Sequence, residues 1–265
     1  MTQTSHTSEL PYVLRHQQEG VLTLTLNRGE KFNPLSEEML TALQSEINAI
    51  AHDKSVRIVI LAAKGKAFCA GHDLKQMRAS PSASYYKKLF DQCSRLMQSI
   101  QQLPQPVIAR VQGLATAAGC QLVSMCDLAV ASSEAQFAVS GVNYGLFCST
   151  PSVGLSRNVP RKQAMEMLLT GEFIDAHTAR ERGLVNRVTT PEALDAEIAA
   201  LSASILSKPA VAIAMGKQLF YRQLEMGISA AYQLAGETMA CNMMDEAALE
   251  GVQAFIEKRA PSWKS

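Results

Sequence analysis

The chain has 265 residues, a formal net charge of +1 and 47% hydrophobic residues. This length suffices for one large core, or for a core with a small appendage. The balanced charge includes no basic stripe, so nucleic acid is not expected as a partner. No uninterrupted apolar run approaches the ~18 residues that a membrane helix needs, so no membrane association is expected.

Residues 1–11 contain no basic segment followed by an apolar stretch, which is the pattern of a secretory signal. We therefore expect a cytoplasmic protein. The cysteines lack the paired spacing of metal ligands and mostly have apolar neighbours, as is typical of free buried thiols. They are Cys69, Cys93, Cys120, Cys126, Cys148 and Cys241. Neither a zinc site nor a disulfide framework is expected.

The first half of the chain alternates predicted strands and helices. Residues 21–27 alternate threonine with aliphatic residues, as in a strand with one buried face, and Ser36 is placed to cap a following helix. Residues 56–63 are rich in β-branched side chains, as in a strand buried on both faces. Residues 85–103 have helical spacing, and Pro104 ends that helix.

Residues 107–111 predict another strand, which leads directly into Gly113. The alternation of strands and helices predicts the α/β class. From about Leu194 onward the pattern is helical only, and no interior linker rich in Gly, Pro or Ser precedes it. We divide the chain into a core of residues 1–200, which holds the active site, and a helical region of residues 201–265.

Two segments carry the most information. Residues 66–74 read KAFCAGHDL, and residues 113–131 read GLATAAGCQLVSMCDLAVA. They resemble the two oxyanion-hole segments of the crotonase (enoyl-CoA hydratase/isomerase) superfamily. Residues 164–171, 176–188 and 254–259 resemble later helical stretches of that family, in the order that the family has them.

The resemblance implies a fold and partners. The fold would be the crotonase (ClpP-like) spiral of ββα units, with C-terminal helices that pack on neighbouring subunits of a homotrimer or a dimer of trimers. The substrate would be an acyl-CoA thioester, as in fatty acid metabolism. No cofactor beyond the coenzyme A of the substrate is implied, and no metal.

The resemblance assigns the oxyanion donors to the backbone N–H groups of His72 and Ala118. An acyl-CoA thioester reacts through an enolate, and each donor placed at the developing charge is worth about 2.7–4 kcal/mol. Ala118 lies where a run of small residues turns into a helix, and the unpaired N–H groups of a first helical turn favour an anion. The alternative is that these small residues only permit tight packing of the helix on a strand.

Both glutamates that hydratases of this family use are replaced. Gln121 stands at the first glutamate position and Gly141 at the second. A positioned acid or base contributes about 10²–10⁴ in rate, so efficient hydration is not expected. Two functions stay open: an enzyme with altered chemistry, in which Gln121 orients water, and a non-catalytic acyl-CoA binding protein.

Cys148 and Ser149 offer a further possibility for thioester chemistry. Dihydroxynaphthoyl-CoA synthases and chlorobenzoyl-CoA dehalogenases carry aspartates at these two positions, so neither activity transfers. Residues 147–151 predict a helix start, where a thiol can have a lowered pKa and become nucleophilic; the alternative is an inert buried Cys148. This run resembles the branch of the superfamily called enoyl-CoA hydratase domain-containing protein 3.

The imidazole of His72 and the coenzyme contacts complete the predicted site. The imidazole could act as a general base near neutral pH, but we favour a side chain that lines the mouth of the site. Arg28 and Lys31 lie in the loop where the family contacts phosphate. The remaining implied contacts are the backbone of Ala70, Asp73 and Leu74 to the adenine and, from an adjoining subunit, Phe255 and Lys258.

Overall fold

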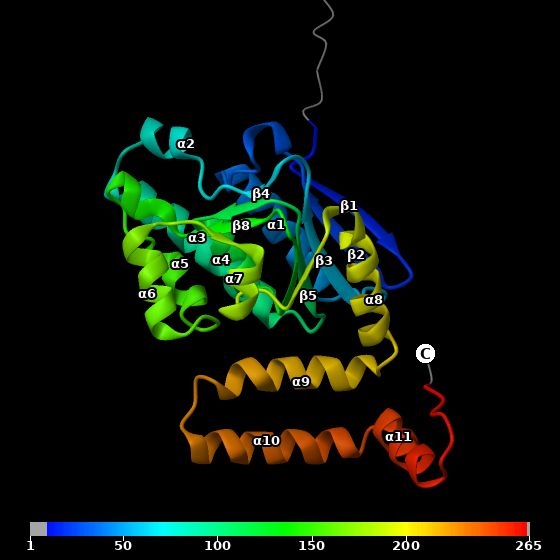
Figure 1. The fold of residues 1–265 in the computed structure, drawn as a ribbon. Helices are drawn as coiled ribbons and strands as arrows, with labels where there is room; N and C mark the ends of the chain where they lie inside the picture. Colours follow the sequence, from blue (N-terminus) through cyan, green and yellow to red (C-terminus); the bar gives the residue numbers. More distant parts are fainter. Residues whose placement is uncertain (1–9, 264–265) are drawn as a thin grey trace, which may run out of the picture.

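The computed structural model describes residues 10–263 (Figure 1). Its main sheet has six strands, of which all neighbours are parallel except β1 and β2. In spatial order they are β1 (Val13–Gln18), β2 (Val21–Leu26), β3 (Ile58–Ala63), β5 (Val107–Val111), β7 (Leu128–Ser132) and β10 (Arg187–Thr189). Parallel strands with interleaved helices confirm the predicted α/β class.

A second sheet has four short strands. In spatial order they are β4 (Ala67–Cys69), β6 (Leu114–Thr116), β8 (Gln136–Ala138) and β9 (Ile174–Asp175). Strands β3, β5 and β7 of the main sheet are each followed directly by β4, β6 and β8 of the small one, and then by helical structure. The chain thus repeats a unit of two strands and a helix, which agrees with the predicted spiral of ββα units.

Helices cover both sheets. They are α1 (Glu37–Ile50), α2 (Leu74–Ala79), α3 (Ala83–Gln102), α4 (Ala118–Met125), α5 (Ser149–Leu155), α6 (Arg161–Thr170), α7 (Ala176–Glu181), α8 (Leu194–Leu206), α9 (Ala210–Gln223), α10 (Ile228–Met243) and α11 (Glu246–Ile256). Short 3₁₀ turns lie at η1 (Gly29–Lys31), η2 (Ser140–Tyr144) and η3 (Pro191–Ala193).

The sequence signals for the first elements are confirmed. The Ser36 hydroxyl accepts the Met39 N–H at 3.2 Å and caps α1. In β3, Val59 and Leu61 pack into the core beneath α1 and α3, whereas Ile58 and Ile60 pack on the other face with residues of α8. Because both faces of β3 are covered, its sequence is apolar throughout.

The last three helices extend away from the two sheets. Helix α8 packs on the main sheet through Leu194 and Ile198, whereas α9 and α10 lie alongside each other below the body, with α11 at their end (Figure 1). The predicted boundary at residue 200 lies inside α8. The exposed helical part begins after that helix. Large exposed apolar side chains of this part include Phe220, Leu224, Ile228, Tyr232, Met239, Met244, Phe255 and Ile256.

No single helix among residues 10–263 is long and apolar enough to cross a membrane. One bent pair, Pro191–Leu206 with Ala210–Gln223, meets the length and composition criteria together, with a bend of 101° between its two parts.

Candidate active site

The first predicted oxyanion segment leaves β4 and turns sharply at Gly71. This residue has a φ of 95°, a left-handed value that glycine adopts at little cost. Its carbonyl oxygen accepts the Leu35 N–H at 2.8 Å, which fixes the segment against the loop before α1. The backbone then passes through His72 into Asp73, the N-cap of α2.

The second segment ends β6 and starts α4 at Ala118. Ala117 joins them with φ 51° and ψ −120°, a conformation that residues other than glycine rarely adopt. Its N–H donates to Ala138 O at 2.9 Å, so β8 holds this turn in place. The Thr116 and Ser140 hydroxyls, both buried, lie 2.9 Å apart and add a second link.

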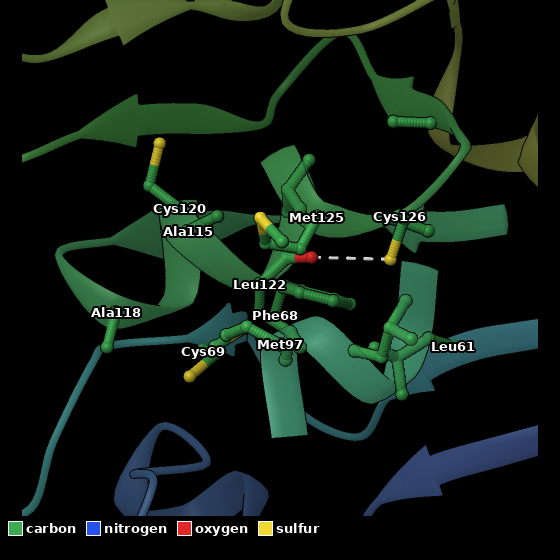
Figure 2. Close-up of a cluster of buried hydrophobic side chains, with 14 of the residues drawn as sticks. Leu61, Phe68, Cys69, Met97, Ala115, Ala118, Cys120, Leu122, Met125 and Cys126 are labelled. Carbon is green, nitrogen blue, oxygen red and sulfur yellow. Dashed lines mark hydrogen bonds between the residues drawn. The ribbon is translucent and has the colours of Figure 1, made fainter. Parts of the chain in front are cut away.

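The two segments meet because β4 and β6 are parallel neighbours. A Cβ atom placed on Gly71 would lie 3.0 Å from Ala117 Cβ and 3.4 Å from the Ala118 nitrogen. A Cβ atom on Gly119 would overlap with Cys69 O, so this glycine is required by packing. Figure 2 shows Ala118 in the first turn of α4, above the chain that carries Cys69.

The backbone N–H groups of His72 and Ala118 have no hydrogen-bond acceptor within residues 10–263. Tight packing explains Gly119, but it does not explain two unpaired donors on converging segments. Such donors can bind an oxygen that gains negative charge, and the start of α4 adds the positive end of a helix dipole. The geometry therefore suits the oxyanion role that the sequence resemblance implies.

Gln121 lies one turn into α4 and is only 4% exposed. Gln121 follows Ala118 by three positions, so the two residues lie on the same face of α4. Its Oε1 atom is buried and has no partner in the described part of the chain. A buried unpaired amide oxygen is costly, so a bound molecule with a hydrogen-bond donor would stabilise it.

Position 141 has no room for a side chain. A Cβ atom on Gly141 would overlap with the Leu146 carbonyl oxygen and would lie 2.8 Å from Cys148 Sγ. The Gly141 N–H donates to that sulfur at 3.3 Å, and Leu146 N–H donates to Gly141 O at 3.0 Å. The second glutamate position is thus closed by the backbone itself.

The reactive-thiol hypothesis for Cys148 is wrong in its electrostatic premise. Cys148 is the N-cap residue of α5 and is 6% exposed. Burial raises the pKa of its thiol above the ordinary value, although the N–H of Gly141 opposes this shift. Ser149 is exposed, and its hydroxyl donates to Phe147 O at 3.4 Å, so neither side chain is set up as a nucleophile here.

The His72 imidazole contacts the loop before α1 and helix α3, and its Nε2 atom is buried without a partner in the described part of the chain. Its Nδ1 lies 3.2 Å from Leu35 O, and its ring meets that of Phe90 edge to face at 5.5 Å. Because a carbonyl oxygen can only accept, Nδ1 carries the proton of the neutral ring. Burial lowers the pKa of His72, so the neutral form dominates at neutral pH. The side chain lies beside the site and packs against α3.

The predicted phosphate contact Arg28 is held by the chain itself. Its guanidinium donates to Leu10 O at 2.6 Å and Pro11 O at 3.1 Å, and it stacks 3.8 Å from the centroid of the Tyr12 ring. These contacts fix the position of the side chain and use some of the N–H donors that could otherwise bind a phosphate. Lys31, in the same loop, is exposed.

The other predicted coenzyme residues fall into two separate places. The N–H of Ala70 donates to Phe32 O at 3.0 Å, Asp73 caps α2, and Leu74 is 58% exposed. Phe255 lies in α11 and Lys258 lies just after it. In Figure 1, α11 is at the end of the molecule that is farthest from α2. A single chain does not bring these two groups together.

Sequence reasoning missed two polar residues that organise this region. Asn33 is fully buried and hydrogen-bonds to the backbone of Arg28 in its own loop, of Lys64 after β3 and of Ala67 in β4. Lys217 of α9 donates to Asp127 Oδ2 at 2.6 Å, and Asp127 lies shortly after the end of α4. The only sequence signal at each position is a polar residue among apolar neighbours. Such a signal does not identify the distant group that the side chain binds.

Among residues 10–263, no group of three His, Cys, Asp or Glu side chains is placed to hold a metal ion. The cysteines within this range are all free, and burial raises the pKa of Cys120 to about 12.

Comparisons with known proteins agree with this geometry. The family model described as enoyl-CoA hydratase/isomerase matches residues 16–265. The chain is 44% identical over 260 residues to enoyl-CoA hydratase domain-containing protein 3, mitochondrial, of Xenopus laevis, covering 98% of this chain and 88% of that protein. It is 32% identical over 253 residues to 2,3-dehydroadipyl-CoA hydratase of Escherichia coli, covering 94% and 96%.

Solved structures give the same assignment. The crystal structure of an enoyl-CoA hydratase of Mycobacterium smegmatis superposes with a TM-score of 0.95 at 63% identity, covering 97% of this chain and 100% of that one. Human enoyl-CoA hydratase domain-containing protein 3 superposes with a TM-score of 0.92 at 42% identity, covering 95% and 100%. The chain therefore belongs to the enoyl-CoA hydratase/isomerase family, with the crotonase fold, in the branch of enoyl-CoA hydratase domain-containing protein 3.

Proposed function

We propose that this protein binds acyl-CoA thioesters and stabilises their enolates through the backbone N–H groups of His72 and Ala118. The observation that carries the proposal is the convergence of the two segments, with no acceptor for either N–H group among the residues that the structure describes. Family membership supports a coenzyme A thioester as the ligand. The enolate oxygen would be placed between the two donors.

Efficient hydration of an enoyl-CoA is not part of the proposed function. Gln121 presents an amide that neither gains nor loses a proton near neutral pH. Gly141 presents no side chain, and its surroundings exclude one. Since a positioned acid or base contributes about 10²–10⁴ in rate, two replacements leave hydration slower by several orders of magnitude.

Calorimetry with a series of acyl-CoAs tests binding, and turnover of crotonyl-CoA tests chemistry. We expect dissociation constants in the micromolar range, or about 7–8 kcal/mol of binding free energy. Absence of heat with every thioester, together with no competition by free CoA, would contradict the proposal. A crotonyl-CoA turnover equal to that of a two-glutamate hydratase would contradict the account of Gln121 and Gly141.

The second candidate is a non-catalytic protein that sequesters or presents an acyl-CoA. The residues Gln121 and Gly141 at the two glutamate positions favour it, because neither can act as an acid or a base. Exchange of the thioester α-hydrogens for deuterium separates the two candidates. A catalyst of enolate chemistry accelerates the exchange, whereas a passive carrier leaves it at the rate in buffer.

Self-association into a trimer or a dimer of trimers is part of the proposal. Phe255 is 84% exposed and Ile256 is 66% exposed on α11, and apolar side chains of this size are normally covered. A neighbouring subunit could bring Phe255 and Lys258 to the coenzyme, which the same chain does not do. Mass measurement in solution tests the assembly.

The compartment is proposed as cytoplasmic, with no nucleic acid or membrane partner. The free cysteines support a reducing compartment. The vertebrate relatives are named as mitochondrial, so a tagged protein imaged in its own cells decides between the two locations.

A further inference from the structure

Asn33 lies in the loop between β2 and α1, at the centre of the contacts that hold the first oxyanion segment. It is fully buried, with 0% of its surface exposed. Its φ is 50° and that of Phe32 is 62°, so two successive non-glycine residues adopt left-handed backbone. Asparagine tolerates this conformation better than most residues, whereas phenylalanine does not, so the surrounding contacts must impose it.

The Asn33 amide uses both of its N–H donors and one acceptor on backbone groups. Oδ1 accepts the Arg28 N–H at 2.8 Å, which closes the loop on itself. Nδ2 donates to Lys64 O at 2.8 Å and to Ala67 O at 2.9 Å. Lys64 follows β3 and Ala67 begins β4, so one side chain fixes both ends of the connection between the two strands.

Backbone hydrogen bonds of the residues on either side of Asn33 also hold the segment that leads to His72. Phe32 O accepts the Ala70 N–H at 3.0 Å, and the Leu35 N–H donates to Gly71 O at 2.8 Å. The loop thus holds the first oxyanion segment from the start of β4 to the residue before the donor. The second donor, Ala118, is held independently through Ala117 and β8. The spacing of the two donors therefore depends on this loop as well as on the pairing of β4 with β6.

We infer that Asn33 is the positioning residue of the first oxyanion donor, fixing the His72 N–H relative to the Ala118 N–H. The inference rests on the proposed function, since it assumes that both N–H groups bind the thioester oxygen. Asn33 itself touches neither N–H group and is not a catalytic residue. Its loss would widen or tilt the pair of donors, and an error of 1 Å in such a site costs about 10²-fold in rate.

The test compares Asn33→Gly with the wild type and with Asn186→Ala. Glycine accepts the left-handed backbone at position 33 but removes all three side-chain bonds. Asn186 is a matched control, because its Oδ1 also accepts a backbone N–H across two segments, that of Ala129 at 2.8 Å, at the other edge of the main sheet. Circular dichroism and thermal unfolding establish that each variant is folded.

The readout is the affinity for acetoacetyl-CoA divided by the affinity for free CoA, together with the ultraviolet absorbance of the bound enolate. For Asn33→Gly we expect this ratio to fall about 10-fold to 100-fold and the enolate absorbance to weaken, while free CoA binds within about 3-fold of wild type. Asn186→Ala should lose stability but keep the ratio. A folded Asn33→Gly variant with the wild-type ratio overturns the inference.

Asn33→Ser provides a milder variant if glycine prevents folding. Its hydroxyl can replace one of the lost bonds, so we expect an intermediate ratio, and an unchanged ratio again overturns the inference. The proposed function fails in a different way, because the wild type would then show no preference for acetoacetyl-CoA over free CoA.

Discussion

The sulfur of Cys148 lies 3.3 Å from the backbone nitrogen of Gly141, in part of the space that a side chain at position 141 would need. Restoring a carboxylate at that position by Gly141→Glu is therefore expected to fail. The new side chain must displace the Leu146 carbonyl as well as the sulfur, and overpacking of this kind costs about 1–3 kcal/mol. Chemical denaturation should show this loss, and crotonyl-CoA hydration should not rise. A stable variant with faster hydration would contradict the closed-site account.

Gln121→Glu is expected to behave in the opposite way, because glutamate has nearly the same volume as glutamine and fits the existing space. One carboxylate next to the oxyanion donors should raise crotonyl-CoA hydration by about 10-fold to 100-fold, less than a complete pair would give. The stopped-flow or steady-state absorbance of crotonyl-CoA measures the change. Gln163→Met, outside the site on α6, serves as the control. Hydration at the wild-type rate would show that Gln121 does not face the substrate.

Lys217→Met should destabilise the fold strongly. The Lys217 ammonium donates to Ile100 O, Gln105 O and Asp127 Oδ2 at 2.6–3.0 Å, and burial lowers its pKa. Removing it leaves the Asp127 carboxylate, whose side chain is 14% exposed, without its cation, which costs about 3–5 kcal/mol for a largely buried pair.

The double variant Lys217→Met with Asp127→Asn should lose less than the sum of the two single changes, with a coupling of about 0.5–3 kcal/mol. Urea unfolding of all four proteins measures this cycle. Strict additivity would show that the ion pair does not couple α9 to the core.

Stability should decrease as the pH falls below 6.5, in part through His72. Burial lowers the pKa of its imidazole in the folded state, so the unfolded chain binds the proton first. The contribution of neutral His72 to the free energy of unfolding is fully present above the pKa of histidine in the unfolded chain. It is lost as the pH falls toward the lower pKa of the folded state, with a slope of at most about 1.4 kcal/mol per pH unit from this one group. Thermal unfolding of wild type and His72→Asn between pH 5 and 8 measures it. Identical pH profiles would contradict the assignment.

The elements that could be predicted from the sequence are those whose signals are local. The threonine alternation of β2, the Ser36 cap and the apolar run of β3 each depend on nearby residues and on whether a face is covered. The two segments that resemble oxyanion-hole segments could be recognised for the same reason, since each is a short continuous motif. Their meeting through the β4–β6 pair is consistent with the motif order but is visible only in the fold.

Contacts between distant residues were not predictable. Lys217 and Asp127 are 90 positions apart, and nothing in either neighbourhood indicates the other. The sequence assigns Arg28 only to the coenzyme. It does not reveal that the guanidinium binds the carbonyl oxygens of Leu10 and Pro11, because that contact depends on the path of the chain. The thiol of Cys148 was assigned a possible lowered pKa from its helix position, but desolvation outweighs that effect.

The central claim is that the Ala118 N–H binds the thioester oxygen, and Ala118→Pro tests it most directly. Proline removes this one N–H, and the first turn of a helix is where proline is best tolerated. Calorimetry with acetoacetyl-CoA and with free CoA, and circular dichroism as the folding control, gives the preference for the enolate. We expect a folded variant that binds free CoA as the wild type does and has lost the preference for acetoacetyl-CoA. A folded variant with the full wild-type preference would show that Ala118 is not an oxyanion donor.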